Sequence, residues 1–298
     1  MEEFFQLVFA GLALGARYAL VALGFVVIYR ATGVINFAQG GLVALGAYVA
    51  YQFAQEWGVP FALAVVLALA VTGLVGVLIE RTMLRRMVGQ PAFAVIMITI
   101  GVLFILEQAI PTVWGYGAQN LGDPWGIRTV DAGGLALAVR DLWTIGLAAL
   151  ALAGFFLFFR YSSLGLAMRA TAFDQEAALA QGISARKIFA LSWGIAGIVG
   201  ALAGVTLASG AAAVDPSISF IALAAFPAMI LGGMDSPPGA VIGGVIIGVT
   251  QTLTAGYQPD HAAWLGSNFH IVMPYVVMVL ILLVRPYGLF GTPEVERI

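Results

Sequence analysis

Residues 4–29 are FFQLVFAGLALGARYALVALGFVVIY, an apolar stretch in which Arg17 is the only charged residue. A helix needs about 20 mainly apolar residues to cross a bilayer, so this stretch predicts a membrane-spanning helix. Eight similar runs follow it, at 38–55, 61–80, 92–113, 140–160, 187–210, 218–234, 238–256 and 269–284. The runs are continuous, which favours helices over the alternating strands of a membrane barrel.

The composition of the whole chain agrees with a membrane protein. Of its 298 residues, 61% are hydrophobic and only 9% are charged, whereas soluble domains carry about 25% charged residues. So little polar surface excludes a soluble enzyme, a nucleic-acid-binding protein and a disordered chain. The sequence predicts an all-α fold, a polytopic integral membrane bundle of about eight to nine transmembrane helices, forming one domain over residues 1–298.

The positions of the basic residues predict the orientation, because loops rich in Lys and Arg stay on the cytoplasmic side of a membrane. Arg81, Arg85 and Arg86 share one loop, and the stretch 160–187 carries a second basic group. Alternation through nine runs then places the N-terminus outside and the C-terminus in the cytoplasm. An eight-helix count would require one run to be re-entrant, and the short run 218–234 is the expected one.

The segment between the first two runs is a candidate part of a translocation path. It reads Gly33-Val34-Ile35-Asn36-Phe37-Ala38-Gln39-Gly40-Gly41, with two amides among three glycines. Non-helical backbone near a membrane survives where it is buried in protein or lines water. The functional interpretation is a broken helix in which Asn36 and Gln39 offer hydrogen bonds to a solute; the alternative is an ordinary cytoplasmic turn.

Arg17 and Tyr18 lie near the middle of the first run. An arginine at that depth costs roughly 2.5–3.5 kcal/mol on insertion scales, so it should face the bundle interior or a wet cavity. Glu80 and Glu107 are the acids of the early helices that we expect near it. The alternatives are an arginine that snorkels to the interface, or one with a purely structural role.

The most polar internal stretch, 160–187, predicts a short helix that lies along the cytoplasmic face. Thr171 or Asp174 can cap it, Gln175 to Gln181 form it, and Gly182 ends it. Presented between two apolar runs, such a helix suits docking into a groove of a partner protein. A plain interfacial helix is the alternative.

Motifs of catalysis are absent from the sequence, which has two histidines, no metal-ligand spacing and no phosphate-binding Gly-Lys-Ser/Thr motif. We therefore expect no cofactor and no enzymatic activity. Buried acids are scarce as well, which argues against a carrier driven by protons and for energy supplied by another chain. Glycines recur every three or four residues at 194–204 and 239–248, a pattern typical of closely packed helices.

Four ordered blocks of sequence resemble branched-chain amino acid ABC transporter permeases of the LivH type. The blocks are 15–40, which includes the Asn36 segment; 174–183, which begins Asp174-Gln175-Glu176-Ala177-Ala178; 225–244, which is rich in glycine; and Arg285-Pro286-Tyr287-Gly288-Leu289-Phe290-Gly291. The resemblance extends from about residue 10 to 297.

The resemblance implies a permease subunit of the bacterial inner membrane, with its N-terminus in the periplasm. It implies a second permease subunit, identical or homologous, two cytoplasmic ATP-binding subunits, and a periplasmic binding protein that delivers leucine, isoleucine or valine. The helix at 173–183 would then couple to an ATPase through Asp174, Gln175, Glu176, Ala177, Ala178 and Gly182. Arg17, Tyr18, Asn36, Gln39, Thr99 and Glu107 become candidates for the substrate path, since a charged amino acid needs a few polar partners.

Other interpretations stay open at this point. A permease for urea, short-chain amides or other amino acids would share the same fold and energy source. A stand-alone channel or secondary carrier would need its own selectivity elements and would work without ATPases.

Overall fold

The computed structural model describes residues 2–87, 90–126, 128–209 and 213–292. Within this part the chain is almost entirely helical, as the sequence predicted. The helices are α1 (Glu2–Thr32), α2 (Gln39–Tyr51), α3 (Phe61–Thr82), α4 (Ala92–Trp114), α5 (Val139–Tyr161), α6 (Ser163–Phe173), α7 (Gln175–Ala180), α8 (Ala185–Ala208), α9 (Ile218–Leu223), α10 (Phe226–Gly232), α11 (Pro237–His261) and α12 (Phe269–Val284). Short π- and 3₁₀-helical turns add Gln52–Glu56, Leu84–Met87 and Ala263–Leu265.

Six helices in the described part of the chain are long and apolar enough to cross a membrane, namely α1, α3 with its following turn, α4, α5, α8 and α11. The most apolar windows of α1 and α8 are 83% buried, whereas those of the other four are 22–33% buried. Because lipid must contact the outward faces, α1 and α8 form the centre of the bundle. The remaining apolar runs form shorter helices, so a count of eight to nine crossings stays a prediction.

The run at 218–234 differs most from a simple spanning helix. It is divided into α9 and α10, of six and seven residues, with Phe226-Pro227 opening the second helix. At 1.5 Å per residue each covers about 10 Å, far less than a bilayer core of about 30 Å. The expectation that this run is re-entrant stays a prediction.

The stretch between the apolar runs 92–113 and 140–160 contains a β-hairpin. Strand β1 (Thr129–Ala132) pairs antiparallel with β2 (Leu135–Ala138), in a register that sets Thr129 opposite Ala138. Gly133 and Gly134 form the turn with positive φ angles of 67° and 89°. Both residues of such a two-residue turn need φ above zero, which glycine adopts without steric cost.

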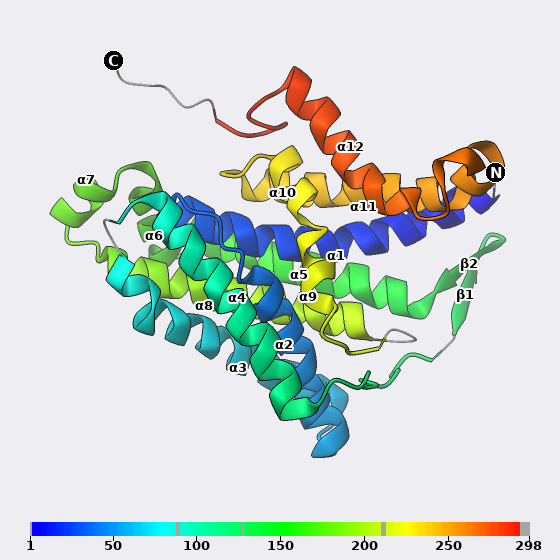
Figure 1. Cartoon of the computed structure of the whole chain (residues 1–298), viewed down its shortest axis with the longest axis horizontal. Helices are drawn as coiled ribbons and strands as arrows, with labels where there is room; N and C mark the ends of the chain where they lie inside the picture. The colour runs from blue at the N-terminus through cyan, green and yellow to red at the C-terminus, as the bar shows by residue number, and fades with distance from the viewer. Residues whose placement is uncertain (1, 88–89, 127, 210–212, 293–298) are drawn as a thin grey trace.

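Glycine faces bring the central helices into close contact, as their spacing predicted. A Cβ atom added to Gly197 of α8 would lie 2.5 Å from the Thr72 carbonyl oxygen of α3. One added to Gly15 of α1 would lie 2.8 Å from the Cα atom of Val245 in α11. The α1–α11 pair thus packs backbone against backbone along the long axis of the molecule (Figure 1).

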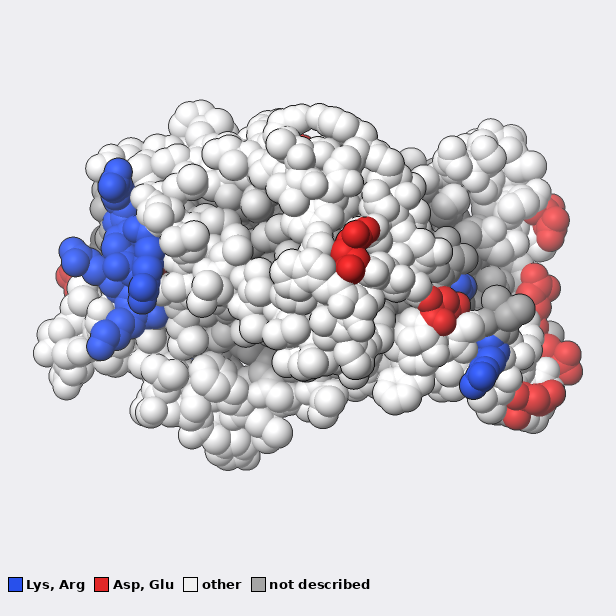
Figure 2. Space-filling model, turned by 90° about the horizontal axis from the view of Figure 1, so that it is seen from below, with Lys and Arg blue, Asp and Glu red and all other residues white. Residues whose placement is uncertain are grey.

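The two ends of the bundle carry different elements and different charges. Helices α6 and α7 lie at one end of the long axis, and the N-terminus and the β-hairpin lie at the other (Figure 1). On the face drawn in Figure 2, Lys and Arg side chains gather at the α6–α7 end and most Asp and Glu side chains gather toward the opposite end. The C-terminal residues 293–298, including the basic Arg297, lie outside the described residues.

Candidate translocation path and coupling helix

The break between α1 and α2 positions Asn36 in the protein interior. Helix α1 ends at Thr32, and Gly33 follows it with a φ of +71°. The Asn36 side chain is fully buried, and its Oδ1 accepts a hydrogen bond of 3.0 Å from the Ala38 amide. Its Nδ2 has no hydrogen-bond partner among the residues that the structure describes. A buried donor without a partner is costly, which makes Asn36 unusual in this interior.

Thr99 of α4 connects α4 to this break by hydrogen bonds. Its Oγ1 accepts a hydrogen bond of 3.2 Å from the Phe37 amide and donates one of 2.8 Å to the Ile96 carbonyl. Asn36 and Thr99, which are 63 positions apart in the sequence, thereby lie together in the structure.

Gln39 has a different environment from Asn36. It is the first residue of α2 and is fully buried, with its Nε2 donating to the Ala196 carbonyl of α8 at 3.2 Å. A Cβ atom on Gly200 would lie 3.0 Å from the same Nε2, so the amide fills a space that a glycine leaves. Gln39 therefore joins α2 to α8, and it is not among the residues that line the cavity beside Asn36.

A cavity of about 260 Å³ lies beside Asn36 and Thr99. Its other walls include Glu80 from α3, Gln175 from α7 and Trp193 from α8. Glu80 and Trp193 were not predicted as lining residues, because they come from helices distant in the sequence and no motif marks them. The cavity thus reaches from the helix break to the first residue of α7.

Glu80 is buried, with 1% of its side chain exposed, and is paired with Arg85. The Arg85 Nη2 lies 3.0 Å from the Glu80 Oε2, and the Arg85 Nε lies 3.4 Å from Oε1. A buried carboxylate needs such a partner to stay charged. Glu80 therefore pairs with the turn after α3 and is not the partner of Arg17.

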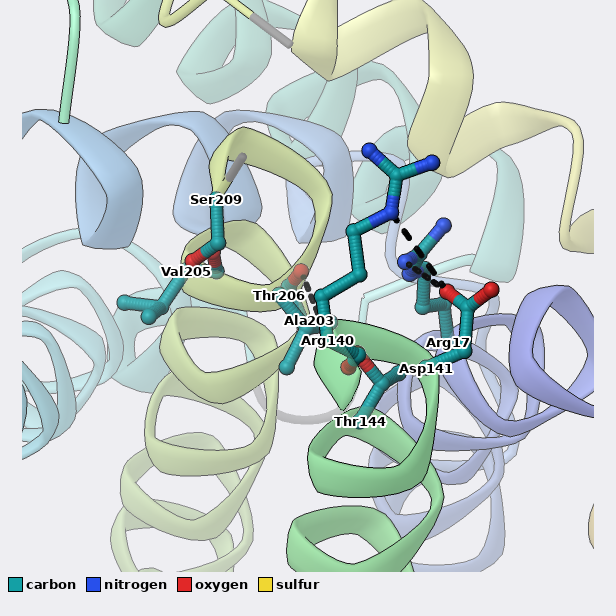
Figure 3. A network of polar contacts seen from close by, with 8 residues as sticks. All are labelled: Arg17, Arg140, Asp141, Thr144, Ala203, Val205, Thr206 and Ser209. Carbon is teal, nitrogen blue, oxygen red and sulfur yellow. Dashed lines mark hydrogen bonds and ion pairs between the residues drawn. The ribbon is translucent and has the colours of Figure 1, made fainter. Parts of the chain in front are cut away.

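Arg17 is directed into the bundle, but its acidic partner was predicted wrongly. Its Nη2 lies 3.4 Å from the Oδ1 of Asp141, and the side chains are only 20% and 14% exposed. Figure 3 shows Arg140, whose Nε lies 3.9 Å from the same oxygen, approaching Asp141 together with Arg17. Asp141 belongs to the first turn of α5, 124 positions away, and nothing local in the sequence connects it to Arg17.

Tyr18 and Glu107 bind neighbouring helices. The Tyr18 hydroxyl donates to the Gln251 Oε1 of α11 at 2.8 Å, and the Glu107 Oε1 accepts a hydrogen bond of the same length from Ser219 in α9. Neither residue is part of the cavity beside Asn36. The six path candidates are therefore spread over several helix contacts, and only Asn36 and Thr99 share this cavity.

The short helix expected after residue 173 is present as α7, and its cap is Asp174. The Asp174 side chain accepts a hydrogen bond of 2.9 Å from the Ala177 amide, while Thr171 donates to Ala167 within α6. Gly182 follows the helix with a φ of +81°, and Ala178 is the buried residue of the helix. Gln175, Glu176 and Ala177 are exposed, and so is Leu179, so α7 presents a mixed polar and apolar surface at the basic end of the bundle (Figures 1 and 2).

A model of the family described as branched-chain amino acid transport system / permease component matches residues 7–282. The chain belongs to this family. It is therefore a permease component of an ABC importer and a multi-pass membrane protein of the inner membrane, and it is not itself an enzyme.

Curated relatives match over nearly the whole chain. The high-affinity branched-chain amino acid transport system permease protein LivH of Escherichia coli (strain K12) is 31% identical, over 99% of this chain and 98% of the relative. The corresponding permease BraD of Pseudomonas aeruginosa is 30% identical with the same coverage. The fructose import permease protein FruF of Bifidobacterium longum is 25% identical, over 79% of this chain and 67% of the relative.

Among solved structures, PsaBC from Streptococcus pneumoniae in complex with Fab is similar with a TM-score of 0.47 and 15% sequence identity. The similarity covers 91% of this chain and 89% of that one.

Proposed function

We propose that this chain forms the translocation path for leucine, isoleucine and valine in a bacterial importer. The observation that carries the proposal is the 31% identity to LivH over 99% of the chain, together with the family match at residues 7–282. In this assembly a second permease subunit, identical or homologous, completes the membrane part. Two cytoplasmic ATPases and a periplasmic binding protein are the remaining partners.

The proposed orientation has the α6–α7 end in the cytoplasm and the N-terminus in the periplasm. The clustering of Arg and Lys at the α6–α7 end supports it, because basic segments are retained on the cytoplasmic side. Glu2 and Glu3 open α1 at the opposite end, where the β-hairpin also lies.

In the proposed mechanism, α7 transmits the movement of an ATPase to the path. Helix α7 is capped, exposed and separated from α6 by Asp174, so a partner can bind it as a unit. Its first residue, Gln175, lines the cavity that also contains Asn36 and Thr99. A displacement of α7 would therefore change the shape of this cavity directly, and alternating access follows if the bundle has two discrete packings.

Substrate competition in proteoliposomes tests the proposed substrate class. The permease is reconstituted with its cognate ATPases and binding protein, and ATP-driven uptake of labelled leucine is measured. We expect unlabelled isoleucine and valine to compete, and urea, acetamide, aspartate and fructose not to. Competition by urea and acetamide instead would assign the chain to an amide importer, and competition by aspartate would assign it to another amino acid.

Cysteine labelling tests the orientation. The chain has no native cysteine, so the unmodified chain gives no background labelling. We expect a membrane-impermeant maleimide added to the periplasmic side to label A136C in the hairpin and to spare Q181C after α7; both positions are exposed. Permeabilised membranes serve as the control, in which both variants should react. Periplasmic labelling of Q181C alone would reverse the proposed topology.

A further inference from the structure

Accepting the proposed function as its basis, we propose that the cavity beside Asn36 is a resting site for one aliphatic amino acid within a single permease subunit. Glu80 would receive the ammonium group, the Asn36 amide would donate to the carboxylate, and the apolar wall would hold the side chain. Glu80 is not one of the six path candidates predicted from the sequence.

The size of the cavity fits a small solute. Its volume of about 260 Å³ equals that of roughly nine water molecules at about 30 Å³ each. It also lies just below the range of roughly 300–1,000 Å³ that is usual for drug-sized ligands. A single amino acid therefore fits.

The polar groups of the cavity match the two charged ends of an amino acid. Glu80 is the only charged residue among those described that line it. Its carboxylate keeps acceptor capacity beyond its hydrogen bonds to Arg85, so it can receive a ligand N–H. Asn36 is fully buried and contributes a donor, Nδ2, that has no hydrogen-bond partner among the residues that the structure describes. An acceptor on the ligand would satisfy this donor and remove its desolvation cost.

Apart from Thr32, Gln90, Thr99 and Gln175, the rest of the wall is apolar and matches an apolar side chain. Val95 of α4, Phe189 and Trp193 of α8, and Ile28 of α1 face the cavity together with Leu84 after α3. Aliphatic and aromatic walls around a few convergent polar groups are the usual composition of a small-molecule site. A sugar or urea would leave this wall without a partner, and a dicarboxylic amino acid would bring a second carboxylate close to it.

Equilibrium binding of labelled leucine to the purified transporter complex tests the site, with neither nucleotide nor binding protein present. We expect saturable binding and at least tenfold weaker competition by isocaproate, which lacks the ammonium group, and by isoamylamine, which lacks the carboxylate. The variants N36L and E80Q should each weaken leucine binding at least tenfold. V95W should abolish binding by filling the cavity.

The matched control for V95W is V113W, because Val113 lies on the same helix and is 69% exposed. V113W should bind leucine as the unmodified protein does. The analogue measurements need no variant and decide the question even if V95W fails to fold. Wild-type complexes that import leucine but show no saturable binding would overturn the resting site and leave the proposed function intact. The same conclusion would follow if both analogues bound with the same affinity as leucine. Absence of leucine import by the wild-type complex would instead contradict the proposed function.

Discussion

Replacing Gly248 with valine will prevent most of the chain from accumulating in a folded form. Gly248 lies where α11 crosses α1, and even a Cβ atom there would come within 2.6 Å of the Gly11 carbonyl oxygen. The opposing atoms belong to the backbone of α1 and cannot rotate away, so the two helices must separate. Overpacking of a core costs about 1–3 kcal/mol and occasionally more, and we expect at least a tenfold loss of monodisperse protein.

The measurement is size-exclusion chromatography of detergent-solubilised membranes that contain a fluorescent fusion. G154V is the matched control, because Gly154 lies within spanning helix α5 and a Cβ atom there meets nothing within 4 Å. We expect its yield to equal that of the unmodified chain. Equal yields for G248V and G154V would show that α1 and α11 do not pack as closely as described.

Disrupting both ends of α7 will uncouple ATP hydrolysis from transport. D174A removes the side chain that caps the helix, at a cost of about 1 kcal/mol. G182V places a β-branched residue at a φ of +81°, a conformation that costs of order 1–3 kcal/mol for residues other than glycine. A helix of six residues cannot absorb both losses, so we expect uptake to fall at least tenfold in the double variant.

Parallel assays of ATP hydrolysis and leucine uptake in proteoliposomes measure this effect. The double variant should hydrolyse ATP without the stimulation that substrate-loaded binding protein gives to the unmodified complex. D174S and G182N form the control pair, since serine can cap a helix and asparagine tolerates the left-handed region. Unchanged, stimulated transport by D174A/G182V would rule out α7 as the coupling element.

Much of the fold follows from local sequence patterns. The apolar runs predict α1, α3, α4, α5, α8 and α11 because a bilayer demands helices of a minimum length. The end of α1 at Gly33 and the cap at Asp174 also follow from nearby residues. Glycine spacing predicts which helix faces pack closely, since small residues are what allow backbones to approach.

The candidate site depends on contacts that local patterns do not contain. Asp141 opens α5, and only the packing of α5 on α1 brings it to Arg17. Glu80 was expected near Arg17, yet the turn after α3 brings Arg85 to it at 3.0 Å. The cavity exists only where five helices and the Val34–Asn36 break converge, so its lining could not be derived from any one segment.

The β-hairpin was missed for a different reason. Its strands have four residues each, and β2 consists of Leu and Ala, which have no strong preference for strands in this context. The glycine pair at 133–134 was the available signal, because two adjacent glycines between short apolar stretches favour a two-residue turn.

The central claim is that this bundle moves its solute only when partner ATPases drive it. The most direct measurement is leucine accumulation in proteoliposomes that contain the permease subunits alone, the full complex, or the full complex with hydrolysis-deficient ATPases. Our account predicts accumulation by the complete, active complex and none by the other two. Accumulation or facilitated entry of leucine through the permease subunits alone would contradict it.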